Sequence, residues 1–262
     1  MKQKIYQIDA FTDKIFSGNP AAVCPLANWL SDDILQKIAM ENNLAETSFY
    51  VKQDNIYQIR WFSPTVEVDL CGHATLAAAY VLFNFEGYND NTINFYSPRS
   101  GELTVTQNDE LLVLNFPTDE FKQIDITEDL TFGFNIKPIQ AFKGKSFYML
   151  LFETEDQINK IIPALDKISK MNAIGVIVTA KGDEVDFVSR CFAPQSGINE
   201  DPATGSAHTI LIPFWSKKLD KLEMKAIQLS KRKGYFQCKY LNERVEISGQ
   251  VKLYLIGEIF LT

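Results

Sequence analysis

Short runs of apolar residues alternate with polar turns along the whole chain, and this pattern is typical of β-strands. The predicted strands are residues 47–51, 56–62, 111–116, 147–152, 173–179, 186–192 and 251–259. Four stretches between the strands show helical periodicity instead. The pattern therefore predicts an α+β fold in which β-structure dominates.

The predicted helices are of two kinds. Two are surface helices, one starting at Ser31 and one opened by a capping box at Thr154–Gln157 and continuing to Leu165. The stretch from about Ala74 to Phe83 is apolar on nearly every face. Such a helix must be surrounded on all sides, and a curved sheet wrapped round it is the simplest arrangement that does so.

The two halves of the chain repeat each other. The two histidines, His73 and His208, each follow within three residues of a glycine, Gly72 or Gly205, that opens an apolar run. Upstream, Arg60-Trp61-Phe62-Ser63-Pro64 corresponds to Arg190-Cys191-Phe192-Ala193-Pro194. We interpret this as an internal duplication.

The chain length fits two similar domains. Each half of the 262 residues is long enough for a core of its own. The first domain is predicted at 1–116 and the second at 117–256, with a linker near Pro117–Glu120, where acidic and turn-forming residues follow a strand.

Charge and hydropathy narrow the possible partners. The formal net charge is −7, which argues against nucleic acid because phosphate binding needs a basic face. The basic run Lys231-Arg232-Lys233 is interpreted as a solvated turn, with a role at the substrate edge as the alternative. No signal-peptide pattern and no membrane-length apolar run is present, so we expect a cytoplasmic protein without a membrane partner.

The cysteines carry no pairing signal. Cys24, Cys71, Cys191 and Cys238 are widely spaced and form no CxxC motif. The spacing predicts reduced thiols, with neither a disulfide framework nor a metal site.

Chemistry is expected near the two glycine-led helices. The first backbone N–H groups of a helix lack intrahelical partners and carry partial positive charge, so two such ends could hold one anion between them. The nearby candidates for acid, base or nucleophile are Glu46, Cys71, His73, Asp201 and Ser206.

Each candidate also has a plain structural interpretation. Glu46 lies between a surface helix and an apolar strand, where an inward-facing carboxyl would be desolvated and able to exchange protons near neutral pH, but the local features by themselves favour a solvated helix-end residue. His73 can be a cap, Asp201 a turn acid before Pro202, and Cys71 a small buried apolar residue. His208 is interpreted as structural.

Five ordered motifs strengthen the catalytic interpretation. They are Gly18–Val23, Asn43–Thr47, Phe62–Pro64, Leu70–Thr75 and Glu200–His208. Together they resemble the PhzF-like family, named for a phenazine-biosynthesis isomerase, and the likeness covers essentially the whole chain. The second half is most similar to the branch that includes the MAWD-binding protein, except that Lys233 replaces a glycine, which puts in doubt any backbone contact to substrate at that turn.

The resemblance implies a fold and a reaction. The fold is the diaminopimelate-epimerase-like one: two similar domains, each a curved sheet round a central helix, with residues 257–262 returning to the first domain and the active site in a cleft between the two. Glu46 falls on the family's acid/base glutamate, with His73, Asp201 and Ser206 around the reacting group. Gly72 and Gly205 mark the helix starts that would bind a substrate carboxylate. The reaction would be a cofactor-independent proton transfer on a small carboxylate, and a homodimer is possible.

Two alternatives stay open. A two-thiol racemase of the same fold would use Cys71 as its first thiol, but the second half offers Asp201-Pro202-Ala203 before Thr204-Gly205 and no cysteine there. A binding or regulatory protein that keeps the fold without turnover is the other.

Overall fold

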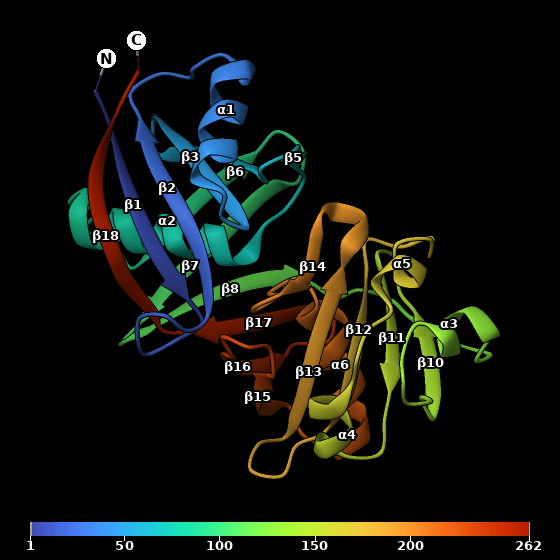
Figure 1. Cartoon of the computed structure of the whole chain (residues 1–262). Coiled ribbons are helices and arrows are strands. Elements are labelled where there is room, and N and C mark those ends of the chain that lie inside the picture. Colours follow the sequence, from blue (N-terminus) through green and yellow to red (C-terminus); the bar gives the residue numbers. More distant parts are fainter. Residues whose placement is uncertain (1, 262) are drawn as a thin grey trace. The chain divides into compact units, whose positions relative to one another are not determined.

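The computed structural model describes residues 2–261, which form two compact units (Figure 1). Unit 1 contains the residues up to Phe116 and those from Ile247 onward, and unit 2 is Pro117–Glu246. The segment that returns to unit 1 therefore begins at Ile247, whereas the sequence suggested Gly257. The end positions Met1 and Thr262 of the predicted domains lie outside the described residues.

Unit 1 is a sheet folded round one helix. Its elements are β1 (Lys2–Ala10), β2 (Asn19–Leu26), α1 (Asp32–Asn42), β3 (Glu46–Gln53), β4 (Ile56–Phe62), β5 (Glu67–Val68), α2 (Gly72–Phe85), β6 (Thr92–Ser97), β7 (Gly101–Asn108), β8 (Leu111–Pro117) and β18 (Val251–Phe260). The strands pair in the order β18, β1, β2, β3, β4, β6, β7, β8. The β2–β3 and β4–β6 pairs are parallel and the others antiparallel.

The apolar helix α2 is enclosed as its sequence predicts. It contacts β1, β2, β3, β7 and β18, and every residue from Gly72 to Ala79 is buried. Helix α1 covers another face of the sheet, where Leu35 and Ile38 pack in a cluster with Phe49. Because α2 has no polar stripe, its whole circumference needs apolar neighbours, which the curved sheet supplies.

Unit 2 contains the remaining elements. They are β9 (Lys122–Ile124), α3 (Glu128–Phe132), β10 (Gln140–Lys143), β11 (Phe147–Leu151), α4 (Glu155–Lys160), α5 (Leu165–Ile168), β12 (Gly175–Lys181), β13 (Phe187–Ala193), the 3₁₀ turn η1 (Pro194–Ser196), β14 (Ile198–Asp201), α6 (His208–Leu219), β15 (Glu223–Gln228), β16 (Gly234–Tyr240) and the first half of β17 (Arg244–Gly249), whose residues from Ile247 belong to unit 1. The predicted linker is anchored to unit 2, because Thr118 donates hydrogen bonds to the carbonyls of Asn242 and Glu243.

The strand pairing confirms the internal duplication. In unit 1 the pairs along β1, β2, β3, β4, β6 and β7 are antiparallel, parallel, antiparallel, parallel and antiparallel. The pairs along β10, β11, β12, β13, β15 and β16 follow the same sequence. In register, Thr47 pairs with Phe62 as Val176 pairs with Phe192.

An arginine pair marks the same place in each unit. Arg60 forms a bidentate salt bridge with Glu67 and lies over the Phe62 ring. Arg190 forms the corresponding bridge with Glu200 and lies over the Phe192 ring. A bidentate guanidinium fixes the direction of its partner as well as its distance, so each arginine anchors the segment that leads to the central helix.

One predicted helix is broken in the structure. Thr154 caps α4 through a hydrogen bond from the Gln157 amide, as the capping box predicts, but the helix ends at Lys160 and α5 begins only at Leu165. The cause is Pro163, which lacks an N–H donor and forces the preceding residue out of helical geometry. The prediction of one continuous helix from Thr154 to Leu165 is therefore wrong.

Helix α6 is the central helix of unit 2. Trp215 stacks on Phe187 of β13 and donates its indole N–H to Thr179 of β12. Pro213 lies inside the helix and cannot bond the Thr209 carbonyl, which instead accepts from the Asp119 amide at 3.1 Å. His208 at the start of α6 is fully buried against the Phe236 ring, and its Nδ1 lies 2.9 Å from the Thr204 carbonyl.

His208 makes the stability of unit 2 depend on pH. Burial lowers the pKa of His208 to about 4, from its ordinary value of 6.5. In the unfolded chain His208 binds a proton below about pH 6.5, whereas in the folded chain it does so only below about pH 4. The free energy of unfolding should therefore fall by about 3 kcal/mol as pH drops through this window.

Urea unfolding of the wild type and His208→Gln between pH 7 and pH 4 measures this effect. The carboxylates contribute equally to both proteins, so the difference in slope belongs to His208. Parallel pH profiles of the two proteins would show that His208 is not held neutral.

Candidate functional site

Glu46 is the first residue of β3. Helix α1 ends just before it, and the C-cap residue Asn43 has a left-handed backbone that turns the chain into the strand. Parallel pairing places Glu46 beside Ala21 of β2. The residue is only 8% exposed, so it is an inward-facing carboxyl rather than a solvated helix end.

His73 lies in the first turn of α2 and faces this carboxyl. Its Nε2 is 3.2 Å from Glu46 Oε2, and both side chains are at least nine-tenths buried. Oε2 accepts no hydrogen bond within the described residues, so the contact is close in distance but lies off the N–H direction. The carboxylate oxygen therefore lies beside the imidazole without accepting a hydrogen bond from it.

Asn19 holds the other side of the imidazole. Its Nδ2 lies 3.1 Å from His73 Nδ1 in a fully buried contact. In this orientation of the amide, Nδ1 accepts the hydrogen bond, and the ring proton is then on Nε2, the nitrogen that lies 3.2 Å from Glu46 Oε2. Asn19 was not among the predicted site residues, although it lies in the Gly18–Val23 motif.

Cys71 completes this group in unit 1. Its Sγ lies 3.4 Å from His73 Nδ1 and 3.9 Å from Nε2. Cys71 is the N-cap of α2, but its side chain makes no capping hydrogen bond, and no acidic residue lies in the first turn. The start of α2 at Gly72, predicted from the sequence, is confirmed.

Asp201 is held in unit 2 by a buried polar network. It ends strand β14 rather than lying in a turn, and its Oδ2 accepts a 2.5 Å hydrogen bond from the Thr204 hydroxyl. Gln228, fully buried, donates to the Asp201 carbonyl at 2.6 Å and accepts from the Thr204 amide at 2.8 Å. Thr204 and Gln228 were not predicted, because Gln228 is 24 or more residues away along the chain.

The Gly205 prediction needs correction. Helix α6 begins at His208, and Gly205 to Ala207 form a turn before it. The Gly205 carbonyl accepts from the His208 amide in a tight turn, which delays regular helix geometry by three residues. Ser206 is half-buried in this turn, and its hydroxyl makes no hydrogen bond within the described residues.

The thiols outside this group are inert. No disulfide forms among the four cysteines, all of which lie in the described chain and are buried. Burial raises the pKa of Cys24 to about 12, and burial together with the Asp201 charge raises the pKa of Cys191 above its ordinary range. Buried protonated thiols of this kind are poor nucleophiles and poor bases.

The turn at Lys233 keeps the backbone shape of a glycine. Lys233 has φ = 58°, in the left-handed region, and its amide donates to Ser230 at 3.1 Å. Lys231 and Lys233 are exposed, which agrees with a solvated turn. The turn therefore keeps its left-handed conformation with a lysine in place of glycine, at the cost of backbone strain.

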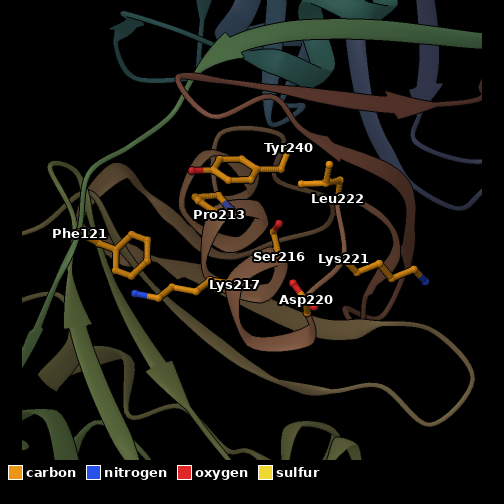
Figure 2. A pocket seen from close by; sticks show the side chains of 8 residues that line it. All are labelled: Phe121, Pro213, Ser216, Lys217, Asp220, Lys221, Leu222 and Tyr240. Carbon is orange, nitrogen blue, oxygen red and sulfur yellow. The ribbon is translucent and has the colours of Figure 1, made fainter.

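A cavity of about 390 Å³ lies elsewhere in unit 2 (Figure 2). Its lining includes Phe121, Lys217 and Tyr240 around the last turn of α6. The C-terminal end of a helix carries partial negative charge, which disfavours an anion. None of the predicted site residues lines it, so this cavity is not the predicted carboxylate site.

Solved structures with little sequence identity to this chain share its fold. A probable proline racemase from Agrobacterium radiobacter K84 has the same fold, with a TM-score of 0.69, 8% identity and coverage of 99% of this chain and 93% of that one. Among the described residues, no helix has the length and apolar character of a membrane span.

Sequence relationships then define the family. The model of the phenazine biosynthesis-like proteins, PhzC-PhzF, matches residues 8–255. An uncharacterized isomerase of Pseudomonas aeruginosa is 44% identical over the full length of both chains. The crystal structure of a phenazine biosynthesis protein of the PhzF family from Enterococcus faecalis has a TM-score of 0.96 at 44% identity, covering both chains completely. The chain belongs to the phenazine biosynthesis-like family and is an isomerase by class.

Gly18 is predicted to control the position of Asn19. It has φ = 64°, and a Cβ there would overlap the Ala10 carbonyl oxygen and lie 2.9 Å from the Thr12 side chain. Gly18→Ala should therefore lower the free energy of unfolding by more than the about 1 kcal/mol expected from the backbone alone, and it should disturb the His73 imidazole signals in NMR spectra.

Gly87→Ala is the matched control, since Gly87 has φ = 68° and open space around its Cβ position. Equal losses of stability in the two variants would contradict the steric argument.

Proposed function

We propose that this isomerase moves a proton within a small carboxylate-bearing metabolite, without a cofactor, and that Glu46 is the single proton carrier. The Glu46 carboxylate takes a proton from a carbon next to an unsaturated group or a carboxylate, and the electron pair left behind is delocalised into that group. The carboxyl then returns the proton to another carbon on the same face. The observation that carries the proposal is the buried Glu46 oxygen, close to His73 yet accepting no hydrogen bond.

The environment of Glu46 suits this role. A carboxylate engaged by several donors is a weak base, whereas one with an unoccupied oxygen can accept a proton from carbon. The neighbouring imidazole limits where the carboxylate can point, because the side chain of His73 is fixed between Asn19 and Cys71. Proton transfer between carbons needs such fixed geometry more than it needs a strong base.

The duplication itself argues for one carrier rather than two. The paired registers align Thr47 with Val176, so Glu46 corresponds to Gly175. A Cβ at Gly175 would already lie 2.7 Å from the Phe192 carbonyl oxygen, which leaves no space for an acidic side chain. Within the described chain, the second unit therefore has no acid at the position that mirrors Glu46.

Substrate binding is proposed at the starts of the two central helices. Amides of the first turn of α2, from Gly72 onward, are proposed to bind a carboxylate, and so are those of the Gly205–Ala207 turn in unit 2. Asp201, held by Thr204 and Gln228, and the Ser206 hydroxyl are proposed as polar contacts to a substrate. His73 would balance charge as the proton arrives at Glu46 and leaves it.

The two-thiol alternative has less support. Cys71 offers one thiol beside His73, but the segment from Pro202 to Ala207 contains no second one. Cys191 pairs with Asp201, directly before that segment, and burial raises the pKa of its thiol and keeps it protonated. A non-catalytic binding protein is disfavoured by the intact buried pair of Glu46 and His73.

We further propose that the protein acts in the cytoplasm and forms a homodimer. Strand β18 carries Tyr254, Leu255, Ile256 and Phe260 with between 43% and 71% of their surface exposed. Exposed apolar side chains gathered on one strand are typical of an interaction surface.

Substitution of Glu46 tests the proposal. A mixture of small carboxylic acids, each with a C–H next to a double bond or carboxylate, is incubated with the protein and followed by NMR for isomerised products. Glu46→Gln should fold normally and lower the rate of any such conversion by roughly 10²- to 10⁴-fold, the usual worth of general acid/base catalysis.

Cys71→Ala is the control and should cost far less. If the cysteine variant abolished turnover while Glu46→Gln stayed active, the two-thiol mechanism would replace the one proposed here.

A further inference from the structure

Glu46, Cys71 and His73 together resemble the donor set of a metal site. One ligand atom from each residue lies within 4.8 Å of the other two, and all three residues are buried. A thiolate, an imidazole and a carboxylate are the donors that zinc takes in proteins. The spacing of the cysteines gave no sign of this, because Glu46 is brought to Cys71 and His73 only by the fold.

We propose that Cys71, His73 and Glu46 bind Zn²⁺ or a similar soft divalent cation, and that this cation switches the isomerase off by occupying the Glu46 carboxylate. Metal binding stands on the geometry of the three residues alone. The inhibitory consequence rests on the proposed role of Glu46 as proton carrier.

Two separations approach the edges of a tetrahedral ion, and the Cys71 side chain must rotate away from the ring for an ion to bind through Nε2, because Sγ lies 3.4 Å from Nδ1. Zinc bonds of about 2.3 Å to sulfur and about 2.1 Å to nitrogen and oxygen give tetrahedral edges of about 3.4 Å between N and O and about 3.6 Å between S and N. The corresponding separations are 3.2 Å for His73 Nε2 to Glu46 Oε2 and 3.9 Å for Cys71 Sγ to His73 Nε2. The third edge, from Sγ to the carboxylate, is at most 4.8 Å and needs to close by about 1.2 Å at most.

The Glu46 oxygen supplies an independent sign of a ligand. It is a polar atom on a side chain nine-tenths buried, it points to His73, and it accepts no hydrogen bond within the described residues. Buried polar atoms are normally satisfied, so one that is not calls for a partner. A cation satisfies it, and the three protein ligands leave a fourth position for water or a substrate carboxylate.

The protons balance in a simple way. The Cys71 thiol loses its proton to the buffer as the S–metal bond forms, because the thiolate is the ligand. The imidazole must bind through Nε2, so its proton moves to Nδ1, where the Asn19 amide can accept it by turning its oxygen to the ring. One proton is therefore released for each ion bound, and no oxidant or reductant is needed.

Cobalt titration tests the site directly. Co²⁺ is added to the purified full-length protein in a non-thiol reductant, and a thiolate-to-cobalt charge-transfer band should grow to one equivalent and then vanish when Zn²⁺ is added. Cys71→Ala should lose the band, and its Zn²⁺ affinity should fall by more than the about 10- to 100-fold that loss of an outer-sphere partner costs. Cys24→Ala is the matched control, since Cys24 is buried in the same unit and should leave the band intact.

Calorimetry in two buffers of different ionisation enthalpy should report about one proton released per Zn²⁺. An absent band, or a band that survives in Cys71→Ala, would overturn the site.

Zn²⁺ should also stop turnover of the wild type, and a chelator should restore it, whereas Cys71→Ala should resist inhibition by Zn²⁺. If the metal binds but Glu46→Gln remains fully active, the proposed function fails and the metal site stands. If Glu46→Gln is inactive and no metal binds, only this inference fails.

Discussion

The candidate chemistry of this chain depends on one buried contact, that between Glu46 Oε2 and His73 Nε2 at 3.2 Å. A carboxylate and an imidazole rarely lose their water unless the fold fixes both, and here three elements do so. Strand β3 begins at Glu46, helix α2 carries His73 in its first turn, and β2 begins at Asn19, which holds the far side of the ring. The curved sheet round α2 serves this site because it excludes water from the start of the helix as well as from its apolar sides.

The duplication accounts for the shared strand order of the two units, and the differences between the two copies give each unit its own polar residues. Both units keep the same strand order and the same arginine–glutamate bridge over a phenylalanine. Glu46, however, is replaced in the second copy by Gly175. The central helix of unit 1 begins directly at Gly72, whereas that of unit 2 begins only after a three-residue turn. One copy thus offers a base, and the other offers the Asp201–Thr204–Gln228 network.

Much of the fold could be predicted from the sequence, because its signals are local. The strand at 56–62 matches β4, and the apolar stretch at 74–83 lies inside α2, since alternation and an all-round apolar pattern depend only on neighbouring residues. Errors arose where one residue overrides the pattern, as at Pro163, which divides the predicted helix into α4 and α5. The return to unit 1 at Ile247 was misplaced because strand pairing joins residues far apart in the chain.

The candidate site was predictable in part for the same reason. Glu46, His73 and Gly72 stand in motifs whose resemblance to the family pointed to them directly. Asn19, Thr204 and Gln228 act through contacts between distant segments, and the grouping of Cys71 with Glu46 exists only in the folded chain. Polar networks of this kind leave no periodic trace in a sequence, so they became visible only in three dimensions.

The central claim is that one carboxyl moves the proton on one face of the substrate. The most direct measurement uses a substrate identified by the carboxylic-acid screen, converted in deuterated water and analysed by NMR for the position of the label. The account predicts deuterium only at the carbon that receives the proton, and only to the extent that the Glu46 carboxyl exchanges with solvent between the two steps. Deuterium at the original stereocentre of an inverted product would contradict it, because that result requires a second base on the opposite face.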